Sequence, residues 1–292
     1  MAKTRTILRR IRAIRNIRTV TKAMETVASA RFRKVHNQSQ AYRPFAVQVA
    51  DMVGDLIARA EGGRLDHVLL VEPEGIRRDV LLVIGSDRGL CGSYNAGVVG
   101  VAIERMARLR EAGYEVQLHV VGSRAVRYLR FRGFEIDRVY DDLGDAAEYR
   151  AAAALANSMM ADFLARRIGG LEVAYMQFVS SGQQRPAIAR LLPLLDLPGA
   201  KERAPLGEPA PYDFLPSAEQ ILDKLLPATV RLRLYECFLE AEVSEQLMRM
   251  SAMRAATDNA DDMTHDLHVR YNRLRQMQIT TELTEIIGGR GE

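Results

Sequence analysis

The chain has 292 residues, of which 48% are hydrophobic and 27% charged, a composition typical of a folded protein with one or two domains. Its net charge is +4, and it contains two cysteines, Cys91 and Cys237, and five histidines. With so few thiols and imidazoles, we expect no disulfide framework and no structural zinc site.

Positive charge is concentrated at the N-terminus. Residues 1–34 carry 11 basic side chains and one acidic side chain, Glu25, whereas the rest of the chain carries 30 basic and 36 acidic residues. This asymmetry indicates a partner with a negative surface, which is a nucleic acid, a membrane or an acidic protein. The alternative is a solvated helical face, although so many like charges repel one another. No apolar stretch of signal-peptide type follows these residues, so we expect no secretory signal.

The first predicted element is a long helix. Residues 1–53 contain no glycine and only one proline, Pro44. Apolar residues recur every 3.3 positions on average, at Ile7, Ile11, Ile14, Ile17, Val20, Met24 and Val27. A stripe that repeats faster than 3.6 residues winds helices around each other with a left-handed twist. The stripe therefore predicts one strand of a coiled coil, and Gly54 and residues 60–63 are expected to loosen its end.

The middle of the chain alternates between two periodicities. Apolar, β-branched runs predict strands over residues 80–84, 116–121 and 174–179, with an edge strand at 135–140. Helices are predicted over 95–111, 123–131 and 149–168, the second of them capped by Ser123. Alternating strands and helices are typical of a doubly wound α/β domain. Residues 193–216 contain six prolines and are predicted to be a linker.

A glycine-rich turn, GSDRGLCG, occupies residues 85–92 between a predicted strand and a predicted helix. That is the position of a nucleotide-binding loop, so a nucleotide-dependent enzyme is one hypothesis. The segment lacks the Gly-Lys-Ser/Thr sequence of a P-loop, and no acidic residue ends the next strand. Asp87, Arg88 and Cys91 have no histidine near them in sequence to act as an oriented base. We therefore interpret the segment as a tight turn and expect no catalytic site and no bound cofactor.

The last predicted element is a second long helix. Residues 228–287 contain neither glycine nor proline, and no window of this run approaches 18 uncharged residues, which excludes a membrane span. Pro227 is interpreted as a first-turn residue or as a kink that joins a short helix from 217 to 226. Ser217 and Gln220 form a capping-box pattern for that short helix, and Gly288 and Gly289 mark the end.

Two long helices at the two ends of one chain predict an antiparallel pair. The expected fold is mixed α+β and α/β: a two-helix coiled coil formed by the N- and C-terminal helices, with an inserted doubly wound α/β domain. The predicted segments are residues 1–60, 66–205 and 217–287. A basic coiled-coil nucleic-acid-binding protein is the alternative function, but the basic segment has no interleaved aromatic residues before Phe32.

Three blocks of sequence resemble the gamma subunit of the F-type ATP synthase. The first is IRAIRNIRTVTKAMETVASARFRK at residues 11–34, and the second is SDRGLCG at 86–92. The third comprises AATDNA at 255–260, YNRLRQ at 271–276 and ITTELTEI at 279–286. Because the blocks lie in order at both ends and in the middle, the resemblance covers nearly the whole chain.

The resemblance implies a rotor without a catalytic site of its own. In this family the terminal helices form a central shaft inside a hexamer of alpha and beta subunits, and the α/β domain lies with the epsilon subunit on the membrane-embedded c-ring. Ion flow turns the ring and the shaft, which drives ATP synthesis. The basic N-terminal face would meet acidic surfaces of the beta subunits, and no nucleic acid is implied. The implied location is peripheral, on the cytoplasmic side of a bacterial inner membrane.

Contact residues are carried over from the matching blocks. Met24 corresponds to the methionine that faces the beta-subunit lever. The polar positions that contact the hexamer correspond to Arg249, Arg275, Gln276, Thr280 and Glu282. The chain departs from the family where Met277 and Gln278 replace small residues and where Thr26 replaces a methionine. The paired-cysteine insertion of the chloroplast form is absent, so redox control is not implied.

Overall fold

The computed structural model describes residues 2–59, 67–141, 143, 148–194 and 218–288. The chain forms two compact units. The helical unit comprises Met1–Ala30 and Arg249–Glu292, and the α/β unit comprises Arg31–Met248. Helices α1 (Ala2–Arg59) and α5 (Ala218–Gly288) contribute to both units.

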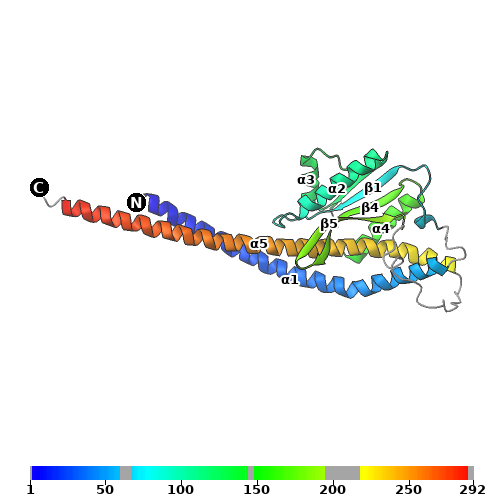
Figure 1. Ribbon diagram of the computed structural model, residues 1–292, viewed down its shortest axis with the longest axis horizontal. Coiled ribbons are helices and arrows are strands. Elements are labelled where there is room, and N and C mark those ends of the chain that lie inside the picture. Colours follow the sequence, from blue (N-terminus) through cyan, green and yellow to red (C-terminus); the bar gives the residue numbers. More distant parts are fainter. Residues whose placement is uncertain (1, 60–66, 142, 144–147, 195–217, 289–292) are drawn as a thin grey trace. The chain divides into compact units, whose positions relative to one another are not determined.

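Within each unit α1 and α5 lie side by side and antiparallel (Figure 1). They have 58 and 71 residues, which matches the two long runs without helix-breaking glycines. The predicted antiparallel coiled coil of the terminal helices is confirmed. In the described helices, no stretch has the length and apolar character needed to cross a bilayer.

The α/β unit is built on a five-stranded sheet in the order β3-β2-β1-β4-β5. The strands are β1 (Arg78–Ile84), β2 (Glu115–Val121), β3 (Arg138–Tyr140), β4 (Gly170–Ser180) and β5 (Gln183–Leu192). The first four are parallel, whereas β5 returns antiparallel to β4. This arrangement confirms the doubly wound domain and places β3 at one edge, as predicted.

Helices cover both faces of the sheet. Alternate residues of β1 point to opposite faces, so Leu81 and Val83 pack with α2 (Tyr94–Glu111) and α3 (Ser123–Phe131). Val80, Leu82 and Ile84 pack with α4 (Tyr149–Leu164) and with buried residues of α5 and α1. Each such aliphatic side chain contributes about 1.5–3 kcal/mol when it is fully buried. The long helices of this unit therefore complete the core on one side of the sheet.

Three expectations about helix boundaries need correction. Pro227 is not a first-turn residue, because it lies inside α5, which begins nine residues earlier and is anchored in the core there by buried Leu222 and Leu226. The continuous helix agrees with the alternative interpretation, in which Pro227 joins the preceding short segment to the long helix. Gly54 lies inside α1, where buried Val53 and Leu56 hold the helix through Arg59 and offset the about 0.5–1 kcal/mol cost of an internal glycine. Ser217 of the predicted capping box lies outside the described residues.

Ser123 does not cap α3, which is the third correction. The cap residue is Gly122, with φ of 93°, where a β-carbon would lie 2.5 Å from the carbonyl carbon of Gly85. The Ser123 hydroxyl instead donates to the carbonyl oxygen of Asp87 at 3.0 Å. Only glycine fits this approach of the two loops, so the serine lies one position inside the helix.

Strand β5 has no counterpart among the predicted elements. It carries Pro186, Arg185 and Arg190, which weaken the pattern of a buried strand. An edge strand tolerates proline because one side of its backbone has no ladder partner. Strand β4 begins at Gly170 rather than at residue 174, and α4 ends at Leu164 rather than at residue 168.

Candidate functional site

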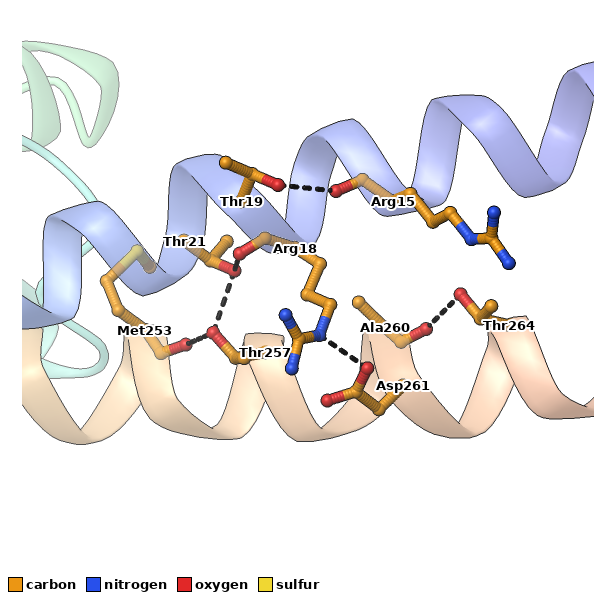
Figure 2. Close-up of polar contacts among 9 residues, drawn as sticks. All are labelled: Arg15, Arg18, Thr19, Thr21, Met253, Thr257, Ala260, Asp261 and Thr264. Atoms are coloured by element: carbon orange, nitrogen blue, oxygen red, sulfur yellow. Dashed lines mark hydrogen bonds and ion pairs between the residues drawn. The ribbon is translucent and has the colours of Figure 1, made fainter.

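Polar contacts join the two helices of the helical unit in antiparallel register (Figure 2). The cross-helix pairs of the described residues include Thr4 with Gln278, Arg15 with His268, Arg18 with Asp261, and Thr21 with Thr257. Each step forward along α1 is a step backward along α5. Such contacts fix the register, because a shift by one turn would separate all four pairs.

Thr21 and Thr257 form a buried polar contact within the helical unit. Their Oγ1 atoms lie 2.8 Å apart. Thr21 Oγ1 is also 3.0 Å from the carbonyl oxygen of Arg18, and Thr257 Oγ1 is 2.9 Å from that of Met253. Each hydroxyl has one proton, so one of the two donates across the seam while the other donates to the carbonyl oxygen on its own helix. Because both groups are satisfied, their burial carries no desolvation penalty of an unpaired hydroxyl.

The packed seam follows heptad spacing. On α1 the row includes Ile11, Ile14, Thr21, Glu25 and Ala28, which are buried or half-buried. On α5 it includes Met253, Thr257, Ala260, Thr264 and Leu267. Steps of three, four or seven residues keep each row facing the other helix as the two wind around each other. Several members are small, so the two backbones approach closely there.

The apolar stripe predicted as the seam is correct only at its beginning. Ile11 is buried, but Ile17, Val20, Met24 and Val27 are exposed. The seam repeats every 3.5 residues, whereas the stripe repeats every 3.3, so the stripe rotates away from α5 along the helix. These four residues form an exposed apolar row on α1. Sequence reasoning missed Thr21 and Ala28 as seam residues, and their heptad spacing from Ile11 and Ile14 was the available signal.

The predicted contact residues lie along both helices of the helical unit. Met24 belongs to the apolar row, with 40% of its surface exposed. Arg249 is half-buried and engaged within the chain. The other described positions, Arg275, Gln276 and Thr280, are exposed on α5. The side chain of Glu282 lies outside the described residues.

The contact residues do not converge on one point. Gln276 and Thr280 are neighbours on one face, and Thr280 Oγ1 donates to the carbonyl oxygen of Gln276 at 2.9 Å. Arg249 lies 27 residues before Gln276, about 40 Å along the helix and on roughly the opposite face at 3.6 residues per turn. A catalytic site requires groups within hydrogen-bond reach, whereas these residues suit contacts spread along a rod.

Basic residues dominate the exposed surface of α1 in this unit. Arg5, Arg9, Arg10, Arg12 and Arg15 are all exposed. Arg18 is paired with Asp261, and the hydrogen bond and negative charge of Asp261 raise the pKa of the Arg18 guanidinium. The excess of positive charge at the N-terminus of the sequence therefore lies on the exposed surface of α1, and the contacts with the described part of α5 leave most of it without a negative partner.

The glycine-rich turn of the α/β unit is held by its own side chains. Asn95 accepts from the Ser86 backbone N–H at 3.0 Å and donates to Ser86 Oγ at 2.7 Å. Asp87 Oδ1 accepts from the Ser123 backbone N–H at 2.9 Å. A β-carbon at Gly85 would lie 2.2 Å from Ala125 Cβ, so the glycine permits close packing of the turn against α3. These contacts agree with the interpretation as a tight turn.

Comparison with known proteins covers almost the entire chain. The ATP synthase family model matches residues 3–291. The ATP synthase gamma chain of Rhodopirellula baltica is 39% identical over 99% of this chain and 98% of its own length. The chain belongs to the ATP synthase gamma chain family. The gamma chain of Saccharopolyspora erythraea is 36% identical over 99% of this chain and 97% of its own length.

Solved structures show the same fold at low identity. A chain of the Euglena gracilis mitochondrial ATP synthase, determined as OSCP/F1/c-ring, aligns with a TM-score of 0.68 at 17% identity, covering 99% of this chain and 93% of that one. A chain of the Tetrahymena thermophila central stalk and c-ring aligns with a TM-score of 0.57 at 22% identity, covering 81% and 99%.

Membership in this family defines the chain as a gamma subunit, a non-catalytic rotary component of F-type ATP synthase. The comparisons give no support to the nucleic-acid alternative. The contact residues carried over from the sequence remain predictions.

Proposed function

We propose that the chain is the central shaft that couples ion flow through a c-ring to ATP synthesis in a hexamer of alpha and beta subunits. Residues 1–60 and 217–287 would act as the shaft, and residues 66–205 as the part that meets the epsilon subunit and the c-ring. The assembly would lie at a bacterial inner membrane, with this chain peripheral on the cytoplasmic side. ATP would bind to the hexamer and not to this chain.

The exposed apolar row supports this proposal most directly. Ile17, Val20, Met24 and Val27 lie on one face of α1, and the seam with α5 does not use them. A row of apolar side chains that remains exposed within a basic helix marks a protein contact. Because the row occupies one side only, rotation presents it to successive neighbours in turn. A shaft must be asymmetric in this way to bring three identical sites through different states.

Met24→Lys tests the contact assigned to the row. It adds a cation where an apolar side chain is expected to face the beta-subunit lever, so new state-dependent charge contacts should impair coupling more than assembly. ATP hydrolysis and ion pumping are measured together in reconstituted vesicles. Thr19→Lys adds the same charge at an exposed position about 140° around the helix from Met24 and serves as the control. An unchanged ratio of pumping to hydrolysis in Met24→Lys contradicts the assignment.

Arg249→Leu and Gln276→Leu test contacts along the shaft. Each is expected to slow steady-state ATP hydrolysis by the assembled enzyme, because rotary states lose polar contacts with the hexamer. The isolated chain should unfold within about 0.5 kcal/mol of the wild type in the Gln276 variant, since that residue is exposed. Hydrolysis and circular-dichroism melting are measured side by side. Full activity in both variants, or a lost helical signal in either, counts against these contacts.

A further inference from the structure

Helix α3 of the α/β unit has a strongly basic outward face. Ala125, Val126 and Leu129 are buried in the core, and the opposite face is exposed. That face carries Arg124, Arg127, Arg130 and Phe131. At 100° per residue these four positions fall within about 120° of the helix circumference. Three guanidinium groups and one aromatic ring therefore point outward together.

Arg124 is not placed to stabilise the helix, whereas Arg130 lies in the last turn, where a positive charge favours the helix dipole. The first turn of α3 contains no acidic residue, and Arg124 lies there, where a positive charge opposes the helix dipole. Arg124, Arg127 and Arg130 follow one another at intervals of three, so like charges are neighbours. In the part of the chain that the structure describes, none of the three forms an ion pair. Within the described residues, these three positive charges therefore have no negative counterpart.

Apolar side chains lie at both ends of this basic face. Phe131 is 90% exposed at the C-terminal end of α3. At the other end, Leu90 of the glycine-rich turn is 59% exposed. A β-carbon on the adjacent Gly89 would lie 3.4 Å from the Arg124 guanidinium carbon, so Leu90 borders the basic face. The two apolar residues thus flank the three arginines.

The backbone of Leu90 adopts an unusual conformation to hold this position. Its φ is 64°, in the left-handed region that a branched side chain rarely occupies. Glycine would relieve the strain, and the turn already contains glycines on either side at positions 89 and 92. Because Leu90 is exposed, packing of its side chain in the core does not offset the cost of the strained backbone. A strained and exposed apolar residue is best explained by a contact that uses its side chain.

We propose that Leu90, Arg124, Arg127, Arg130 and Phe131 form a docking surface for an acidic protein segment with apolar residues at its ends. Carboxylates accept paired hydrogen bonds from guanidinium groups, and aromatic residues and arginines are both enriched at protein interfaces. Binding to a fluid lipid surface strengthens with net positive charge and with inserted apolar groups, but it does not require a single leucine at a fixed position. The strain at Leu90 therefore favours a protein over a membrane.

We seek the partner in assembled ATP synthase, and in that respect the inference rests on the proposed function. Assembly of the wild-type chain with alpha and beta subunits is scored first on a native gel, which tests the proposed function alone. Phe131→Cys then carries a benzophenone label in the assembled enzyme, and the cross-linked peptide is identified by mass spectrometry. The native cysteines, Cys91 and Cys237, are buried, and the labelled wild type measures any background from them.

The expected adduct is a segment of another subunit that contains several carboxylates. Adding Arg127→Glu should lower its yield by at least about threefold, because charge reversal opposes acidic partners. Arg110→Glu, at an exposed arginine in the last turn of α2, should leave the yield unchanged. Adding Leu90→Gly should lower the yield while the melting temperature of the chain stays equal or rises, since glycine relieves the strain.

Three results would overturn the proposal. The first is attachment of the label to lipid, or to a polypeptide segment without carboxylates. The second is a yield that Arg127→Glu and Leu90→Gly leave unchanged. The third is the absence of any adduct in the assembled enzyme when the same label at the exposed Leu164→Cys position on α4 is shown to be reactive.

Discussion

Helix α5 has two different environments along its length. Up to Met248 it belongs to the α/β unit, and most of its residues from Val230 to Leu247 are buried. From Arg249 onward it belongs to the helical unit, where the buried residues of the described part are Met253, Thr257 and Ala260 and most of the others are exposed. The first part packs with the sheet, α4 and α1, whereas the second part has α1 as its packing partner.

The number of packing partners explains the residue types. A helix covered on several sides needs large apolar residues around its circumference, as Leu234, Tyr235 and Phe238 show. A helix paired with one other needs only a row every 3.5 residues, and there Thr257 and Ala260 suffice. Stability is therefore concentrated in the α/β unit, while the helical unit keeps its surface free for partners.

The largest effect on the free energy of unfolding is expected from truncation of a buried side chain in the α/β unit. Phe238→Ala removes a buried ring from the core and should destabilise the chain by about 3–5 kcal/mol. The free energy of unfolding is measured by urea titration. Met253→Ala, a buried seam residue of the helical unit, is the matched variant and should cost less, because its surroundings can close up more easily. Equal losses of unfolding free energy in Phe238→Ala and Met253→Ala would contradict the claim that the two parts of α5 have different environments.

A smaller effect is expected from Glu240, which lies between α5 and β4. Burial and the negative charge of Glu236 raise the pKa of Glu240 to about 7, although Phe178 N–H and Tyr175 donate hydrogen bonds to it and Arg43 opposes the shift. The folded state thus holds this proton up to about pH 7, whereas an ordinary glutamate loses it near pH 4.5. Stability should therefore fall as the pH rises between these values and level off above pH 7.

Glu240→Gln removes this dependence and should gain on the order of 1–3 kcal/mol at pH 8 relative to the wild type. Asp79 also has a pKa raised by burial, to about 6, so it continues to lower stability up to that pH in the variant. Urea titrations at pH 5, 6, 7 and 8 separate the two groups. A fall in stability from pH 6 to pH 7 that is unchanged in Glu240→Gln would contradict the assignment.

The smallest effect is expected in the helical unit. Thr21→Val keeps the shape of the seam but removes the hydroxyl contact with Thr257, at a cost of about 0.5–1.5 kcal/mol. The double variant with Thr257→Val should cost less than the sum of the single changes, because both remove one contact. Arg18→Ala breaks an exposed ion pair and should leave the unfolding curve unchanged. Additive losses from the two threonines would show that the hydroxyls act independently.

Sequence patterns predicted the central strand and the two long helices. The unbroken spacing of apolar residues at 80–84 is typical of a strand that is buried on both faces, and the long helices were recognisable because their runs lack helix-breaking glycines. Edge strand β5 was missed because Pro186 and its arginines obscure that spacing. The stripe on α1 was wrongly assigned to the seam beyond Ile14. Its apolar residues are exposed there, and the residues buried against α5 are Thr21 and Ala28. Residues that contact a partner and residues that are buried in a core are both apolar, so the sequence pattern alone does not distinguish them.

The contact between Thr21 and Thr257 joins residues that are 236 positions apart in the chain. During synthesis at about 5–20 residues per second, the start of α1 waits about 10–50 s before its partner has been made. In that interval it is a single helix of marginal stability that displays both its seam and its apolar row. The α/β unit, whose residues all precede Arg249, can close before the helical unit begins to pair. Its closure packs its own parts of α1 and α5 against each other, which shortens the loop that the later pairing must close and lowers the entropic cost of that pairing. The helical unit is therefore the last part of the chain to fold and the part most in need of protection while it waits.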